Sequence, residues 1–258
     1  MGKRKADNGG KRNHKKFKAS AIIEPNTTGI YATCTRGKEK GCVKELMNLF
    51  TEKAEEYYDL SAVEDDEETD GEEPKELSIE DQIKKEVEDL KDTKSKKSLF
   101  SALNLECECL VFIKTKKPIE PELFCKKVCQ DSFRSKIKTT RFTQKLTPVT
   151  FTVSASIEEL KKLCTRVLAP HFHQENDQVP VKFAINVTRR NFNAIEKDVI
   201  IKTVAEMVGR DHGHSVDLKN YHKLILIECY KTSIGMSVVD DYEKLCKYNL
   251  QQIYEKST

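Results

Sequence analysis

The sequence predicts an α/β protein of two subdomains, with a basic tail and an acidic insertion that are disordered. Strand-like apolar runs alternate with segments of helical periodicity along most of the 258 residues. The net charge of +3 conceals two segregated stretches: residues 1–18 hold eight Lys/Arg and one Asp, and residues 64–81 hold eleven acids and one Lys. Charged residues make up 34% of the chain and its mean hydropathy is -0.61, so we expect a sizeable share of it to remain in water.

The tail and the insertion delimit the predicted domains. Residues 1–25 combine Lys, Arg, Asn and Gly with a single aromatic residue, a composition that cannot bury enough apolar area to offset chain entropy. Residues 61–104 are too long for a loop inside a compact domain. The first subdomain therefore takes residues 26–60 and 105–144, and the second takes residues 145–258. The basic tail is typical of a nuclear or nucleolar address and also of a nonspecific hold on RNA phosphates, and the two roles are compatible.

The first subdomain is expected to begin with a strand at residues 30–35, followed by a turn at Arg36-Gly37 and a long helix. Six apolar residues at helical spacing mark the buried face of that helix: Val43, Leu46, Met47, Phe50, Ala54 and Tyr57. After the insertion, residues 107–114 predict a strand. Pro121 suits the first turn of the next helix.

A strand at residues 149–154 and a capped helix are expected next. Ser156 and Glu159 form a capping box, and the helix should stop at Pro170. Residues 30–169, without the insertion, thus predict the order β-α-β-α-β-α.

The C-terminal part repeats this alternation. Residues 181–187 alternate as a strand, and Asn193 with Glu196 predicts the cap of a helix that ends at Gly209. Residues 223–230 form the most apolar strand, and residues 233–239 are its expected hairpin partner. A final helix is expected to carry five apolar residues: Tyr242, Leu245, Cys246, Leu250 and Ile253.

Catalytic and metal-binding motifs are scarce in this sequence. It contains no dinucleotide-binding, Walker, esterase or zincin motif, which weakens the case for an enzyme. Cys107-x-Cys109 and Cys125-x-x-x-Cys129 could supply four zinc ligands, but their apolar neighbours favour small buried hydrophobic residues. No apolar run approaches the roughly 18 residues that span a bilayer, and the first residues lack the apolar core of a secretory signal. We expect a protein that stays inside the cell with reduced thiols and without membrane contact.

Basic residues without acidic neighbours suggest a polyanionic partner. Residues 132–157 contain five basic residues and no acid. Arg189-Arg190-Asn191 lies between a strand and the helix expected to start at Asn193, so both guanidiniums could share one phosphate-binding corner with helix N–H groups. The alternative is that these arginines point to solvent or pair with Glu196 and Asp198. Replacing both with alanine should leave the fold intact, because changes at exposed surface positions usually alter stability by no more than about 0.5 kcal/mol.

Three C-terminal segments together resemble the THUMP domain, an RNA-binding module of RNA-modifying enzymes. These segments are VKFAINVTRRNFNAIEKDVIIKTVAEMVG, HSVDLKNYHKLILIECYKTSIGMSVV and DDYEKLCKYNLQQIY. Upstream, GIYATCTRGKEKGCVKEL and RFTQKLTPVTFTVSASIEEL are similar to one branch of that family, the stand-alone adaptors required for N4-acetylcytidine formation in tRNA. The resemblance implies a ferredoxin-like N-terminal subdomain followed by a THUMP domain.

The resemblance also implies a function. Such an adaptor binds tRNA and presents serine and leucine tRNAs to a separate RNA cytidine acetyltransferase, which modifies a D-arm cytidine. It is not an enzyme, it has no small-molecule substrate or cofactor of its own, and acetyl-CoA and ATP belong to the partner. Carried over by position, the RNA-facing candidates are Arg189, Arg190, Asn191, Lys219 and Lys231 in the THUMP part and Arg36, Lys38, Arg141 and Lys145 in the ferredoxin-like part.

A different class of function competes with this interpretation. In a nucleolar RNA-binding scaffold or ribosome-assembly factor, the basic tail and acidic insertion would bind partners while the folded core stayed passive. Both alternatives place the protein in the nucleus, most naturally in the nucleolus, with the cytoplasm as the other compartment to consider.

Overall fold

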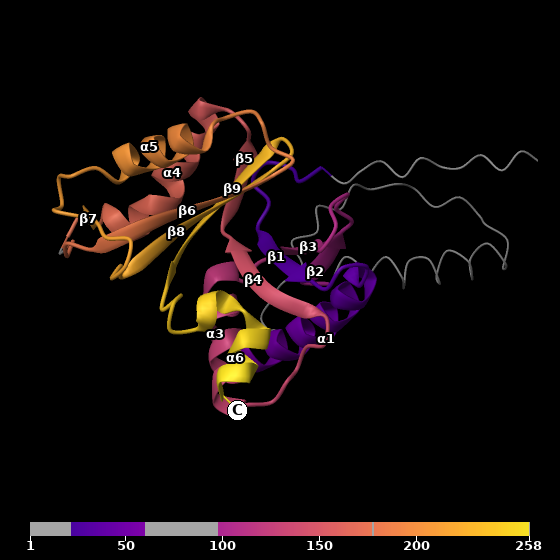
Figure 1. Cartoon of the computed structure of the whole chain (residues 1–258). Helices are drawn as coiled ribbons and strands as arrows, with labels where there is room; N and C mark the ends of the chain where they lie inside the picture. The colour runs from indigo at the N-terminus through magenta and orange to yellow at the C-terminus, as the bar shows by residue number, and fades with distance from the viewer. Residues whose placement is uncertain (1–21, 60–97, 177, 258) are drawn as a thin grey trace, which may run out of the picture.

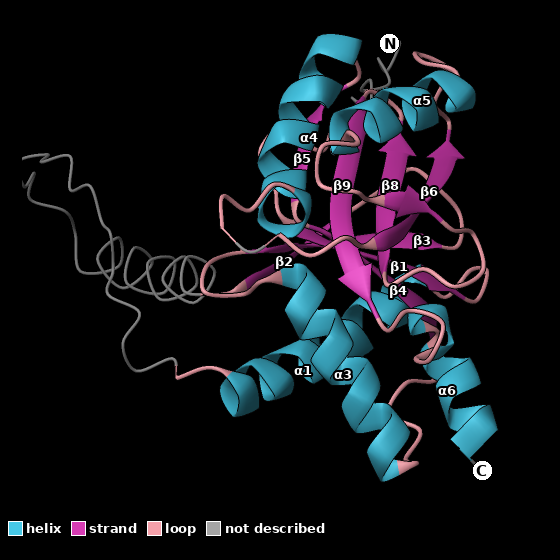
Figure 2. Ribbon diagram, turned by 90° about the vertical axis from the view of Figure 1, so that its left-hand side faces the viewer, coloured by secondary structure: helices cyan, strands magenta, loops and turns pink. Residues whose placement is uncertain are grey.

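The computed structural model describes residues 22–59, 98–176 and 178–257, which form two β-sheets and the helices that cover them (Figure 1). The predictions of disorder for the tail and for most of the acidic insertion concern residues outside these ranges. Figure 2 shows the strands of the two sheets running crosswise, with helices α1, α3 and α6 on one side of the molecule and α4 and α5 on the other. The α/β fold class is confirmed.

The first module has the ferredoxin-like order β-α-β-β-α-β. Its elements are β1 (Gly29–Cys34), α1 (Glu39–Tyr57), β2 (Phe100–Leu103), β3 (Leu110–Thr115), α3 (Pro121–Ser135) and β4 (Thr143–Val149). The antiparallel sheet has the strand order β2-β3-β1-β4. Alternate residues such as Ile30 and Ala32 face α1 and α3, whereas Tyr31 faces the second sheet.

Strand β2 lies inside the range predicted to be a disordered insertion, so that prediction is wrong for its last residues. The strand is only four residues long and has one deeply buried side chain, Phe100. The Phe100 ring packs 5.4 Å from Phe50 and 5.6 Å from Phe124. A single aromatic anchor after a charged run gives too little periodicity to be read from sequence.

The second module is built around a mixed five-stranded sheet. Its elements are β5 (Phe151–Ser154), α4 (Ile157–Phe172), β6 (Lys182–Arg190), α5 (Lys197–Val208), β7 (Ser215–Val216), β8 (Lys223–Tyr230) and β9 (Ser233–Asp240). The strand order is β5-β9-β8-β6-β7, with β6 parallel to β7 and β8 and the other pairs antiparallel. The predicted hairpin of β8 and β9 is confirmed.

Helix α4 begins as its sequence predicts but ends later. The Ser156 hydroxyl accepts a 3.2 Å hydrogen bond from the Glu159 N–H, as expected for a capping residue. The helix continues past Pro170 because Phe172 is fully buried in its last turn. The Phe172 ring packs 5.6 Å from Phe183 and 5.2 Å from His214, which holds that turn in place.

The C-terminal residues return to the first module. A short 3-10 turn η2 (Cys246–Tyr248) precedes helix α6 (Leu250–Ser257), where a single helix was predicted, because Cys246, Lys247 and Tyr248 all have positive φ angles. Tyr248 and Ile253 are fully buried in the core that α1 and α3 form with the first sheet. Strand β4 and α6 therefore belong structurally to the first module, although the predicted boundary at residue 145 assigned α6 and most of β4 to the second.

Candidate nucleic-acid interface

Arg189 and Arg190 end strand β6 but lie on opposite faces of the second sheet. Successive strand residues alternate between faces. Phe183 and Val187, in register with Arg189, pack in the α4/α5 core, whereas Ala184, in register with Arg190, faces the first module. The prediction that both guanidiniums share one phosphate-binding corner is therefore wrong.

Arg190 forms an ion pair with a buried acid in the joint between the two modules. Its Nη1 lies 2.6 Å from Glu228 Oε2, and the two side chains are 29% and 5% exposed. Burial raises the pKa of Glu228, and the Arg190 guanidinium beside it acts in the opposite direction. Arg190 thus has a structural role, and the expectation that its replacement leaves the fold intact is withdrawn.

Lys145 lies near the same joint and is a poor candidate for an RNA contact. Its side chain is half-buried, and its ammonium lies 5.6 Å from the centre of the Tyr242 ring. Burial lowers the pKa of Lys145, while the Glu228 carboxylate raises it. Lys145 therefore helps to balance the charge of Glu228 inside the protein.

Arg189 is held by the loop that follows it. Its Nη2 donates a 3.0 Å hydrogen bond to the Phe192 carbonyl, and its Nη1 lies 3.8 Å from Glu196. The predicted cap at Asn193 is wrong, because α5 starts at Lys197 after Glu196 and has no side-chain cap. The buried side chains of Phe192 and Ile195 keep the intervening residues in a loop. Exposed Asn191, with φ 52°, turns the chain out of the strand.

The two lysine candidates of the THUMP part lie at opposite ends of the second sheet. Lys231 follows β8, where its N–H donates to the Arg190 carbonyl and its ammonium lies 2.9 Å from Glu106. Exposed Lys219 precedes β8, in a turn whose N–H groups donate to Asp217. An eight-residue strand separates the two ends, which corresponds to about 25 Å. One compact contact cannot include both lysines.

The structure brings Lys38 and Arg141 together on one aromatic ring. The Lys38 ammonium and the Arg141 guanidinium lie 6.0 and 5.3 Å from the centre of the Phe142 ring. Gly41 lets this ring approach α1, since a Cβ there would lie 2.8 Å from two of its carbons. Both cations are exposed. Cations beside an aromatic ring are typical of surfaces that bind phosphates and stack on bases.

Glu45 of α1 fixes the loop that carries Arg141 and Phe142. Its carboxylate accepts hydrogen bonds from the N–H groups of Arg141, Phe142 and Thr143, at 3.0, 3.0 and 2.6 Å, and a further bond from the Thr143 hydroxyl at 2.6 Å. Backbone N–H groups and one hydroxyl thus anchor the loop before β4 to the Glu45 carboxylate, and these hydrogen bonds do not use the Arg141 guanidinium. A rigid anchor keeps the exposed cations in a defined place.

Three further cations extend this surface and were not singled out from the sequence. Arg134, Lys136 and Lys138 are exposed, and the Lys138 ammonium lies 5.8 Å from the Tyr254 ring of α6. None of the three has an acidic partner within ion-pair distance among the described residues. The acid-free stretch of residues 132–157 was the signal that could have found them. We call Lys38, Arg134, Lys136, Lys138 and Arg141 the basic loop surface.

Arg36 lies outside this surface as an exposed ion pair. Its Nη2 lies 2.9 Å from Glu108, and the two side chains are 77% and 70% exposed. Such a pair contributes little to stability, and Arg36 can exchange its carboxylate partner for a phosphate.

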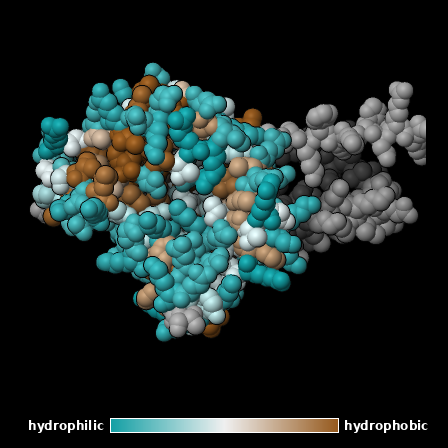
Figure 3. Space-filling view, in the orientation of Figure 1, coloured by the Kyte–Doolittle hydropathy of each residue, from teal (hydrophilic) through white to brown (hydrophobic). Residues whose placement is uncertain are grey.

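Figure 3 shows a largely hydrophilic surface over the lower half of this view, where α1, α3 and α6 lie, and apolar residues gathered over the second sheet and its helices.

The described residues contain no group of three or more His, Cys, Asp or Glu side chains that could hold a metal ion. Cys125 and Cys129 are free and fully buried, and burial raises the pKa of both thiols. This favours the interpretation of these cysteines as core residues. In the part of the chain that the structure describes, no helix combines the length and apolarity needed to cross a membrane.

Comparisons with known proteins place this α/β chain among the THUMP-domain proteins. The THUMP domain matches residues 154–239. The chain is 48% identical to the protein named tRNA acetyltransferase TAN1 of Saccharomyces cerevisiae, over 99% of this chain and 96% of that protein. It is also 32% identical to THUMP domain-containing protein 1 of Bos taurus, over 91% of this chain and 65% of the relative. The chain belongs to the family of THUMP-domain proteins that includes TAN1.

Comparison with solved structures gives matches of low sequence identity. A 4-thiouridine synthetase in complex with RNA matches 83% of this chain and 42% of its own, with a TM-score of 0.43 and 12% identity. PH1313 of Pyrococcus horikoshii matches 83% of this chain and 55% of its own, with a TM-score of 0.44 and 15% identity.

Proposed function

We propose that this chain binds tRNA and acts as an adaptor for tRNA acetylation. In this role it presents serine and leucine tRNAs to a separate RNA cytidine acetyltransferase for N4-acetylation of a D-arm cytidine. Acetyl-CoA and ATP are assigned to the partner enzyme, and the nucleus, in particular the nucleolus, is the proposed location. The observation that carries the proposal is the match to TAN1 along nearly the whole of both chains.

The basic loop surface supports the tRNA-binding part of the proposal. Its cations are exposed and have no carboxylate within ion-pair distance among the described residues, so they can neutralise phosphates and release counterions from the RNA. The Phe142 and Tyr254 rings beside them offer apolar faces to unpaired bases. We therefore assign the main RNA contact of the first module to this surface.

A tRNA-binding titration tests this assignment. The variant Lys136→Ala/Lys138→Ala/Arg141→Ala should bind tRNA roughly tenfold or more weakly at about 0.1 M salt, and the slope of log affinity against log salt should shrink by about two. The control variant Lys117→Ala/Lys127→Ala/Lys161→Ala removes three exposed cations outside this surface and should bind like the wild type. Equal losses in both variants would mean that only net charge matters.

Reconstitution tests the adaptor role. Purified chain, RNA cytidine acetyltransferase, tRNA, acetyl-CoA and ATP should together give acetylcytidine, and omission of either protein should abolish it. Acetylcytidine formed by this chain without the partner would show that it is itself the enzyme. A chain lacking residues 1–25 should still bind tRNA, whereas the alternative of a scaffold with a passive core requires that it does not.

A further inference from the structure

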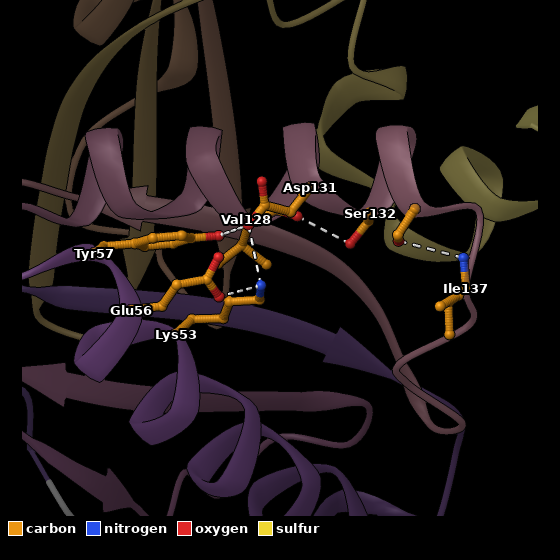
Figure 4. A network of polar contacts seen from close by, with 8 residues as sticks. Lys53, Glu56, Tyr57, Val128, Asp131, Ser132 and Ile137 are labelled. Carbon is orange, nitrogen blue, oxygen red and sulfur yellow. Dashed lines mark hydrogen bonds and ion pairs between the residues drawn. The ribbon is translucent and has the colours of Figure 1, made fainter.

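A groove of about 510 Å³ lies between α1 and α3, on the other side of the loop that carries the basic loop surface. Figure 4 shows its neighbourhood, with Lys53, Glu56 and Tyr57 projecting from α1 and Asp131 and Ser132 from α3. Leu49 and Val128 provide a buried apolar floor. Ile137, 65% exposed, stands on the rim. An apolar floor with an exposed aliphatic side chain beside it offers area for burying a partner's apolar residues.

The rim of the groove is acidic. Lys53 Nζ lies 2.6 Å from Glu56 and 3.0 Å from Asp131, so one ammonium pairs with two carboxylates; Arg134, near the end of α3, also acts on Asp131 from a greater distance. The Tyr57 hydroxyl also donates to Asp131. Glu52 is exposed and has no cation within ion-pair distance among the described residues. Among the residues that the structure describes, Glu45 on the same rim accepts hydrogen bonds from backbone N–H groups and one hydroxyl, and from no cation. The groove therefore carries net negative charge on a basic protein.

The loop before β4 separates this groove from the basic loop surface. Its residues Ile137 and Thr139 line the groove, whereas Lys136 and Lys138 do not. Lys138 instead lies over the Tyr254 ring of α6. Alternate residues of one loop thus serve two surfaces of opposite charge. The carboxylates of the groove repel phosphates, so a nucleic acid bound at the lysines should not extend into the groove.

We propose that the α1–α3 groove binds an amphipathic helix of a partner protein, with lysine or arginine on its polar face. The aliphatic face of that helix packs on Leu49, Val128 and Ile137, and its cations meet Glu52 and Asp131. The groove stays open while tRNA occupies the basic loop surface, so one chain can hold both ligands at once. The partner is the RNA cytidine acetyltransferase, so this inference rests on the proposed function.

The first experiment uses a model helix as the probe. A labelled 18-residue peptide of Lys and Leu, with Leu at helical spacing, is titrated with the full chain by fluorescence anisotropy. Glu52→Lys and Ile137→Asp should each weaken binding roughly tenfold, because the first reverses a charge on the rim and the second replaces the exposed aliphatic contact with a carboxylate. The matched controls Glu206→Lys and Val179→Asp alter an exposed acid and an exposed aliphatic residue of the second module and should change affinity less than about twofold.

Two results would overturn the groove as the binding site. If the control variants weaken peptide binding as much as the groove variants do, the effect comes from the overall charge of the protein and not from the groove. A second peptide has Gln in place of every Leu. If this peptide binds as well as the first, the groove makes no apolar contact with it. Thermal melts of all four variants confirm that each is folded.

The second experiment uses the RNA cytidine acetyltransferase itself, immobilised for biolayer interferometry. The groove variants should lose binding to the enzyme while their tRNA affinity stays at the wild-type level. Equal enzyme binding by the wild type and the groove variants would refute the groove as the docking site for this partner. If the wild type does not bind the enzyme, the proposed adaptor role fails, while the peptide titration still decides whether the groove binds a basic helix.

Discussion

Replacing Arg190 with alanine removes the ion-pair partner of Glu228, whose side chain is 5% exposed, in the joint between the two modules. Glu228 can stay ionised without its partner or take up a proton. Protonating a carboxyl of ordinary pKa 4.5 at pH 7 costs about 3.4 kcal/mol, which sets the scale of the expected loss in the free energy of unfolding. Because burial already raises the pKa of Glu228, we expect a loss of roughly 2 to 3 kcal/mol, or about 5 to 10 °C in Tm.

This loss should depend on pH in a defined direction. Without Arg190, the pKa of Glu228 in the folded state rises further above its unfolded value, so the folded variant binds the extra proton more tightly. The stability linked to that proton is fully present below the unfolded pKa and is lost as pH rises through the folded pKa. The gap in stability between wild type and Arg190→Ala should therefore widen as pH rises above the ordinary carboxyl pKa of 4.5.

Urea unfolding at several pH values measures this gap. The double variant Arg190→Ala/Glu228→Gln should regain most of the lost stability, because a neutral amide needs no cation. A variant Arg190→Ala that melts like the wild type, or a gap that does not change with pH, would refute the structural role of Arg190 and return it to the RNA-binding candidates.

Three further predictions concern other parts of the fold. Ser156→Ala should lower the free energy of unfolding by about 1 kcal/mol in a chemical melt, because the N–H of Glu159 loses its cap; no change would exclude the cap. Gly41→Ala should destabilise the chain by about 1 kcal/mol and weaken tRNA binding, despite the better helix propensity of Ala, because its Cβ displaces the Phe142 ring; a more stable variant with full tRNA affinity would contradict this. Burial and Lys223 lower the pKa of His171 to about 4, so the unfolded chain binds more protons between about pH 6.5 and pH 4, and stability should fall as pH falls through that window. In His171→Gln the fall should be shallower, and identical pH profiles would rule out His171 as its source.

Local patterns predicted most of the fold. The apolar spacing of residues 43–57 marks the buried face of α1, and the run at residues 223–230 coincides with β8. These features depend on neighbouring residues alone, so periodicity reveals them. Periodicity does not say which core a face joins, which is why the return of α6 to the first module could not be predicted.

The arrangement of the candidate site depended on contacts that are distant in sequence. Arg190 and Glu228 are 38 residues apart and meet because β6 and β8 pair in parallel. One local signal was present, since Glu228 interrupts the apolar run of β8 and a buried carboxylate needs a cation. The joining of Lys38 and Arg141 on the Phe142 ring requires the pairing of β1 with β4, which no local pattern reveals.

The return of α6 to the first module also fixes the order in which the chain can complete its folding during synthesis. The sheet and helices of the second module come from one continuous stretch, residues 151–240, and can assemble as soon as that stretch has left the ribosome. The core of the first module cannot be complete until Ile253 has been synthesised, although this core contains β1, the first strand to be made. Its contacts between β1, β4 and α6 span most of the sequence, and such distant contacts form slowly. The contact between the Lys138 ammonium and the Tyr254 ring forms only at that last step, so the basic loop surface gains its neighbour α6 after most of the protein has folded.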